Sequence, residues 1–104
     1  MNDIVEVSLH TIVGKLQQLA PELKAAGVIR LWLFGSRARG DARLDSDLDV
    51  LVDTTARGAE PAFDFFKALR MIEDNVGLPV QISQRELLKP RIIERIADDL
   101  IEVF

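Results

Sequence analysis

Two carboxylates in the middle of the chain lie two positions apart, with apolar residues between and after them. In a strand, Asp47 and Asp49 would share one face while Leu48 points to the core. Acids two residues apart lie roughly 6–7 Å from each other and repel unless a cation lies between them. Hard carboxylate oxygens beside substrate phosphates suit Mg²⁺. The pair therefore predicts a metal site for phosphoryl or nucleotidyl transfer, with a solvated strand edge as the alternative.

A second polar segment lies before these acids, ten residues away. Gly35 would let the backbone approach a ligand closely, and Ser36 would begin a short helical turn whose free N–H groups favour phosphate. Guanidinium groups match phosphate geometry, and three arginines follow: Arg37, Arg39 and Arg43. For each arginine, phosphate contact and a solvated face that balances the nearby aspartates are equally good interpretations.

A calcium-binding loop is a third interpretation of the same segment. Asp45, Asp47 and Asp49 match the first three ligand positions of such a loop. The sixth position, which requires glycine, is Val50, and the twelfth, which requires glutamate, is Ala56. This pattern excludes the calcium loop.

The rest of the chain supplies the elements that must position these residues. Apolar spacing and turn residues predict three strands, at 29–34, 48–52 and 79–83, and helices at 8–20, 61–76 and 91–100, with short turns at 21–27 and 36–39. Alternating helices and strands indicate an α/β or α+β fold in which helices cover a small sheet. Trp32 and the inner side of the 61–76 helix (Phe63, Phe66, Leu69 and Ile72) are expected in the core.

Composition limits the classes of function. The chain has 104 residues, expected to form one domain (1–104), with 48% hydrophobic and 29% charged residues. A net charge of −4 argues against direct nucleic-acid binding, and the absence of cysteine excludes disulfides and zinc–thiolate sites. No apolar stretch is long enough for a membrane span, and the acidic start (1–6) does not match a signal peptide, so we expect a cytoplasmic protein. A domain this small should have a shallow site, or one completed by another chain, and a homo-oligomer is one such arrangement.

The combined motif resembles a known family. Gly35-Ser36, ten intervening residues and Asp47-Leu48-Asp49 look like the signature of the DNA polymerase beta-like nucleotidyltransferases. The fuller segments 33–40 and 46–49 resemble its minimal nucleotidyltransferase (MNT) branch, whose fold has a small mixed sheet, here with three expected strands and about four flanking helices. The resemblance implies that Gly35 and Ser36 hold the triphosphate of ATP, and that Asp47 and Asp49 are catalytic and bind Mg²⁺.

The expected third carboxylate of this superfamily is missing. Members with activity usually carry it on the third strand, and the matching position here is Gln81. Strand parity turns Gln81 toward the acidic face, but an amide cannot accept a proton from the attacking hydroxyl. Asp53, further along the second strand, is a possible substitute, and a partner could supply its own base.

The MNT resemblance also implies a partner, a helical HEPN-type toxin that acts as a ribonuclease. The implied function is that of an antitoxin, which transfers AMP from ATP to a tyrosine hydroxyl of the toxin. The alternative is an antitoxin with weakened catalysis that neutralises its partner by forming a complex. Nucleotidyl transfer to a small molecule is a further alternative, less favoured because no substrate domain is present. The apolar chain end (100–104) is expected to pack on the sheet, or else to contact such a partner.

Overall fold

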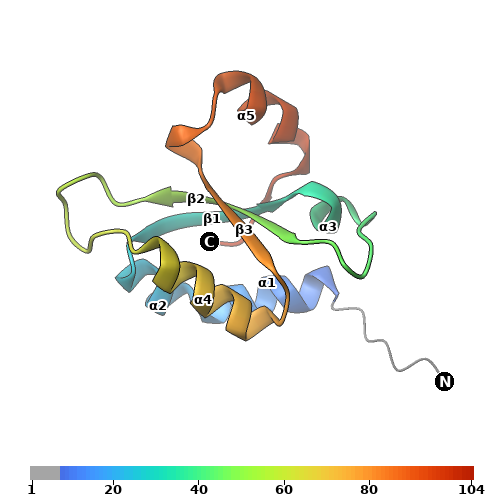
Figure 1. Ribbon diagram of the computed structural model, residues 1–104, viewed down its shortest axis with the longest axis horizontal. Helices are drawn as coiled ribbons and strands as arrows, with labels where there is room; N and C mark the ends of the chain where they lie inside the picture. Colours follow the sequence, from blue (N-terminus) through green and yellow to red (C-terminus); the bar gives the residue numbers. More distant parts are fainter. Residues whose placement is uncertain (1–7) are drawn as a thin grey trace.

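The structure, a computed structural model, describes residues 8–104, so the acidic start at 1–6 lies outside the described part (Figure 1). The helices are α1 (Leu9–Gln18), α2 (Ala20–Ala25), α3 (Gly35–Arg39), α4 (Phe65–Val76) and α5 (Pro90–Ile96). The strands are β1 (Val28–Phe34), β2 (Leu48–Thr54), β3 (Val80–Gln84) and β4 (Ile101–Glu102). Short 3₁₀ turns occupy Arg85–Leu87 and Ala97–Asp99. The expected mixed α/β architecture is confirmed.

The sheet has the strand order β3-β2-β1-β4. β1 runs antiparallel to both β2 and β4, and β2 runs parallel to β3. In this register Asp49 lies opposite Phe34 on one side and Gln81 on the other. The end of β1, the start of β2 and the start of β3 therefore lie next to one another at one end of the sheet.

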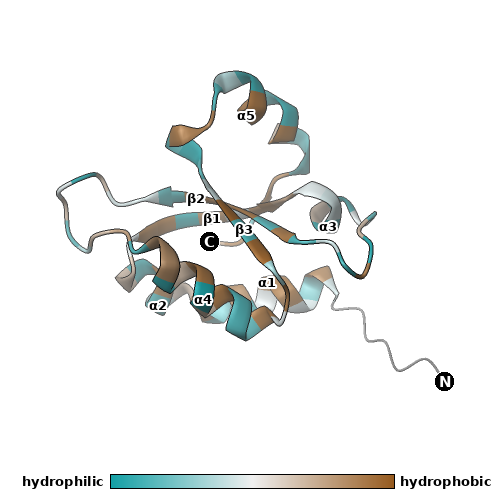
Figure 2. Ribbon diagram, in the orientation of Figure 1, coloured by the Kyte–Doolittle hydropathy of each residue, from teal (hydrophilic) through white to brown (hydrophobic). Residues whose placement is uncertain are grey.

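The main core lies between one face of the sheet and the helices α1, α2 and α4, as Figure 1 shows. Its fully buried members come from alternate strand positions and from single helix faces: Ile12, Leu16, Leu23, Leu31, Leu33, Leu48, Val50, Val52, Ala68 and Ile72. α5 lies on the other side of the sheet. Hydrophilic residues dominate the loop between α3 and β2, which runs beside the predicted site (Figure 2).

Two helix starts show how local chemistry sets the boundaries. Ser8 caps α1, because its hydroxyl accepts a hydrogen bond of 3.1 Å from the backbone N–H of Thr11. The expected start of the second long helix at Pro61 is wrong: Asp64 accepts 3.1 Å from the N–H of Lys67, and α4 begins at Phe65. A side-chain acceptor at Asp64 satisfies an N–H that Pro61 could not.

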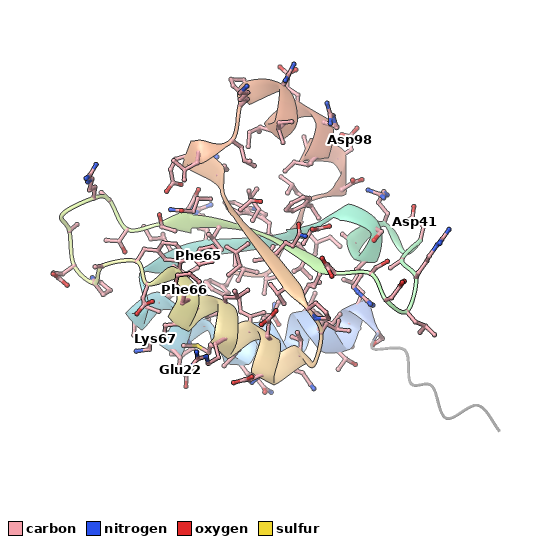
Figure 3. The ribbon with its side chains drawn as sticks, viewed as in Figure 1. Glu22, Asp41, Phe65, Phe66, Lys67 and Asp98 are labelled. Carbon is pink, nitrogen blue, oxygen red and sulfur yellow. The ribbon has the colours of Figure 1, made fainter. Side chains whose placement is uncertain are left out.

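The later start changes which residues of α4 face the core. Ala68, Ile72 and Val76, spaced by four, are buried. The expected core position of Phe66 is wrong, because this side chain lies off that face and is 75% exposed. Phe65 and Phe66 lie near the start of α4, at the opposite end of the molecule from Asp41 (Figure 3).

The chain end packs on the sheet, as one of the two expectations had it. β4 pairs with Trp32 and Leu33 of β1, and the N–H of Val103 donates to the carbonyl of Leu31 at 2.8 Å. The sheet therefore has a fourth strand that the sequence did not predict, because a strand of two residues is too short to show an alternating pattern.

Across residues 8–104, no helix is both long and apolar enough to cross a membrane.

Candidate functional site

The bend after β1 lies directly against a carboxylate of β2. Gly35 begins α3 with a φ of +79°, a conformation that residues with a Cβ rarely adopt. A Cβ at position 35 would overlap Oδ2 of Asp49 and lie 3.1 Å from its Cγ. Glycine is therefore required at position 35 for two reasons: the positive φ, and the space that the Asp49 carboxylate occupies.

Asp47 and Asp49 lie near each other at the start of β2. Burial raises the pKa of Asp49, the negative charge of Asp47 raises it further, and Arg39 partly offsets both. Neither acid forms an ion pair with another side chain of residues 8–104. The two carboxylates thus carry negative charge that no ion pair neutralises, and they suit a divalent cation that takes its remaining ligands from substrate phosphates and water.

Gln81 reaches this acidic pair, as its strand parity predicts. It is the register partner of Asp49 on β3, and its amide Nε2 donates a hydrogen bond of 3.0 Å to Oδ2 of Asp47. Within the described residues there is no cluster of three acidic or histidine side chains that could hold a metal. The third position therefore orients Asp47 and adds no third carboxylate.

The interpretation of Arg37 as part of a solvated face is wrong, because only 7% of the residue is exposed. Its guanidinium donates through Nε and Nη2 to backbone carbonyls of the loop 43–46. These two nitrogens are therefore occupied within the protein. The burial was not readable from the sequence, because Arg37 stands among exposed charged residues.

The two other arginines stay near the surface. Arg39 donates to Asp41 at 3.2 Å and to Asp99, in the turn after α5, at 2.9 Å. The nearby Asp98 also lies on the side of the molecule that carries α3, as Figure 3 shows. Arg43 is exposed in the loop before β2, and its side chain has no ion pair within residues 8–104. Phosphate contact by Arg39 or Arg43 stays a prediction.

Asp53, the possible substitute for the missing acid, is held by a basic side chain. Both of its carboxylate oxygens accept hydrogen bonds of 2.7 Å from the guanidinium of Arg85. That guanidinium also lies 5.3 Å from the ring of Trp32, on the sheet face opposite the main core. Trp32 is half-buried there, so its expected place in the main core is wrong.

A hollow of about 900 Å³ lies around the far end of β2, away from the acidic pair. Its lining includes Asp53, Thr55, Phe63 and Leu87, but not Gly35, Asp47, Asp49 or Gln81. The bend at Gly35 and the starts of β2 and β3 therefore lie outside this hollow.

The nucleotidyltransferase domain family matches residues 11–103. The protein adenylyltransferase MntA of Thermococcus cleftensis is 31% identical over 77 residues, which cover 74% of this chain and 76% of that protein.

Solved structures are also similar. A protein assigned as a minimal nucleotidyltransferase has 30% identity and a TM-score of 0.76, over 94% of this chain and 98% of its own. A toxin–antitoxin structure with AMP-PNP shares the fold, with 14% identity and a TM-score of 0.68 over 88% of this chain and 72% of its own. With its bend, its acidic pair and these relatives, the chain belongs to the nucleotidyltransferase domain family, in the minimal nucleotidyltransferase branch.

Proposed function

We propose that this chain is a Mg²⁺-dependent protein adenylyltransferase that acts as an antitoxin. It would transfer AMP from ATP to a hydroxyl group, that of a tyrosine, on a helical HEPN-type toxin. The observation that carries the proposal is the contact of Gly35 with the carboxylate of Asp49, because it brings a phosphate-binding bend and an uncompensated acid together. The relative named protein adenylyltransferase MntA supports the choice of reaction.

Each residue of the site has a separate task in this proposal. Asp47 and Asp49 would hold magnesium, which when bound neutralises charge on the triphosphate and on the departing pyrophosphate. The backbone at Gly35 and the hydroxyl of Ser36 would bind the triphosphate, and Arg39 and Arg43 are its candidate side-chain contacts. The amide of Gln81 holds Asp47 in place through their 3.0 Å hydrogen bond.

The transfer itself exchanges a phosphoanhydride bond of ATP for a phosphoester bond to the acceptor. The acceptor oxygen forms a bond to the α-phosphorus of ATP while the bond from that phosphorus to the bridging oxygen of the β-phosphate breaks, and pyrophosphate leaves. Because Gln81 cannot accept a proton and Asp53 is bound by Arg85, the hydroxyl proton passes to a base on the toxin or to water. The partner would therefore complete the site.

The neutral residue at position 81 supports a second function. Without a third carboxylate, the chain could neutralise its toxin through complex formation alone, since positioned proton transfer contributes typically about 10²–10⁴ in rate. The neutral Gln81 is the observation that favours this candidate. Both functions need the same partner but differ in whether AMP is transferred.

One experiment separates the two functions. The purified chain is incubated with ATP, Mg²⁺ and the helical protein encoded beside it, and the partner is analysed by intact-mass spectrometry. A mass increase of one or more AMP units, lost when both Asp47→Asn and Asp49→Asn are introduced, supports transfer. A tight complex without a mass increase, unchanged in the double variant, supports complex formation.

A further inference from the structure

Arg37 is a buried cation whose partners are backbone carbonyls. The residue is 7% exposed, and within residues 8–104 no carboxylate pairs with it. Its Nη2 donates to the carbonyls of Leu44 at 3.2 Å and Ser46 at 2.8 Å, and more distantly to that of Arg43 at 3.4 Å. Its Nε donates to the same Ser46 oxygen at 3.0 Å. Burying a charge is costly unless its donors are satisfied, so these bonds tie Arg37 firmly to the loop.

The strongest of these bonds reach the peptide group that precedes Asp47. The carbonyl of Ser46 belongs to the peptide that links Ser46 to Asp47, and it accepts from both Nε and Nη2. The loop is also closed on itself, because Ser46 Oγ accepts 2.9 Å from the N–H of Arg43, and the N–H of Ser46 donates 3.0 Å to the Arg43 carbonyl. The backbone conformation immediately before Asp47 is therefore set by Arg37.

The same short helix thus reaches both acids. At its first residue, Gly35 abuts the carboxylate of Asp49. Two residues later, Arg37 holds the peptide before Asp47. Two carboxylates bind a metal ion well only when they are held at a fixed separation, and surrounding hydrogen bonds maintain that separation.

We propose that Arg37 is a positioning residue, which fixes Asp47 relative to Asp49 through the Ser46 carbonyl and so preorganises the cation site. The inference rests on the proposed function, since it concerns the same acidic pair. A guanidinium is needed because its planar, rigid fork presents Nε and Nη2 to one oxygen while Nη2 also reaches Leu44. A lysine keeps the charge but carries a single nitrogen on a flexible stem, and it cannot reproduce this pattern.

The test measures cation binding by calorimetry, with Mn²⁺ as the probe and no nucleotide present. Arg37→Lys is compared with Arg70→Lys, the same change at an exposed arginine on α4. We expect the Mn²⁺ dissociation constant to rise roughly 10- to 100-fold in Arg37→Lys, the usual effect of losing support behind a metal ligand, and to stay within twofold in Arg70→Lys. An affinity within twofold of wild type in folded Arg37→Lys overturns the inference, because a merely structural arginine would lower the melting temperature alone.

A second variant and the wild-type chain provide the remaining tests. If Arg37→Lys does not fold, Arg37→Gln replaces it: this change removes the buried charge and leaves a single amide nitrogen as donor to the Ser46 carbonyl. Its Mn²⁺ affinity should also fall about tenfold or more, and an affinity within twofold of wild type contradicts the inference. A wild-type chain that binds no Mn²⁺ refutes the proposed function, whereas a wild type that binds, with variants that bind equally, refutes only the role of Arg37.

Discussion

The Cα of Gly35 faces the carboxylate of Asp49 so closely that no side-chain carbon fits between them. Gly35 follows the last residue of β1 and Asp49 is the register partner of that residue, Phe34, so the contact follows from antiparallel pairing. The pairing thereby places the bend at Gly35 beside an acid that lies fourteen positions further along the sequence.

Replacing Gly35 should damage the site more than its backbone strain alone explains. Gly35→Ala introduces a Cβ that overlaps Asp49 Oδ2, in addition to the strain of a positive φ, which costs of order 1–3 kcal/mol. Gly58→Ala is the matched control, because Gly58 has a φ of +86° and open space around its Cβ position. Chemical denaturation should show a larger loss of unfolding free energy for Gly35→Ala. Calorimetry with Mg-ATP should show binding lost in that variant only, and equal behaviour of the two variants would refute the steric argument.

Removing the charge of Asp49 should stabilise the fold at neutral pH. Burial and Asp47 raise the pKa of Asp49 in the folded chain above its ordinary value, so the ionised form is disfavoured by folding. The unfavourable contribution is absent below the unfolded pKa and develops as pH rises through the folded pKa. Asp49→Asn should therefore gain up to about 1 kcal/mol at pH 7, a modest amount because the group is partly solvated, and nothing at pH 3. Urea unfolding at both pH values measures this, and an Asn variant that is less stable at pH 7 contradicts it.

Restoring an acid at position 81 should speed transfer. Gln81→Asp places a carboxylate beside Asp49 in the sheet register and supplies a proton acceptor, a role worth typically about 10²–10⁴ in rate. The change also removes the amide that donates to Asp47 and adds negative charge, so the metal-free protein should melt at a lower temperature. Gln81→Asn, which keeps an amide, is the control. A transfer rate in Gln81→Asp that does not exceed the wild-type rate would show that the missing acid is not limiting.

Neutralising Asp53 should leave the reaction unchanged. Both oxygens of Asp53 accept hydrogen bonds from Arg85 in an ion pair near the surface. Asp53→Asn should therefore lower the free energy of unfolding by about 0.2–1 kcal/mol and leave the transfer rate unchanged. Rate measurements with saturating Mg-ATP check this against wild type. A rate loss of tenfold or more in a folded Asp53→Asn protein would make Asp53 the proton acceptor after all.

Much of the fold was predictable because its signals are local. The apolar run 29–34 and the alternation around Leu48 and Val50 have the period of strands, and Ser8 is a readable helix cap. The start of α4 was misjudged because both Pro61 and Asp64 are residues that commonly begin a helix, and it is Asp64 that forms the cap. β4 was missed because its pairing with β1 depends on residues far away in the sequence.

The candidate site was predictable in its residue types but not in all its contacts. Spacing alone indicated that Asp47, Asp49 and Gln81 share a face, and the 3.0 Å bond from Gln81 to Asp47 confirms that Gln81 reaches it. The burial of Arg37 could not be predicted, because its partners are backbone carbonyls. Every residue has a backbone carbonyl, and the direction of that carbonyl depends on the final loop conformation. The sequence therefore does not indicate which carbonyls contact Arg37.

The position of β1 inside the sheet has a mechanical consequence. β1 is hydrogen-bonded along both edges, to β2 and to β4, so the bend at Gly35 follows an interior strand of the sheet. The 40–46 loop is instead attached through the side chain of Arg37, which contacts its backbone carbonyls. Substitutions of exposed side chains in that loop, such as Arg43 and Leu44, should therefore be tolerated more readily than substitutions at the end of β1, which disturb the pairing with both neighbouring strands.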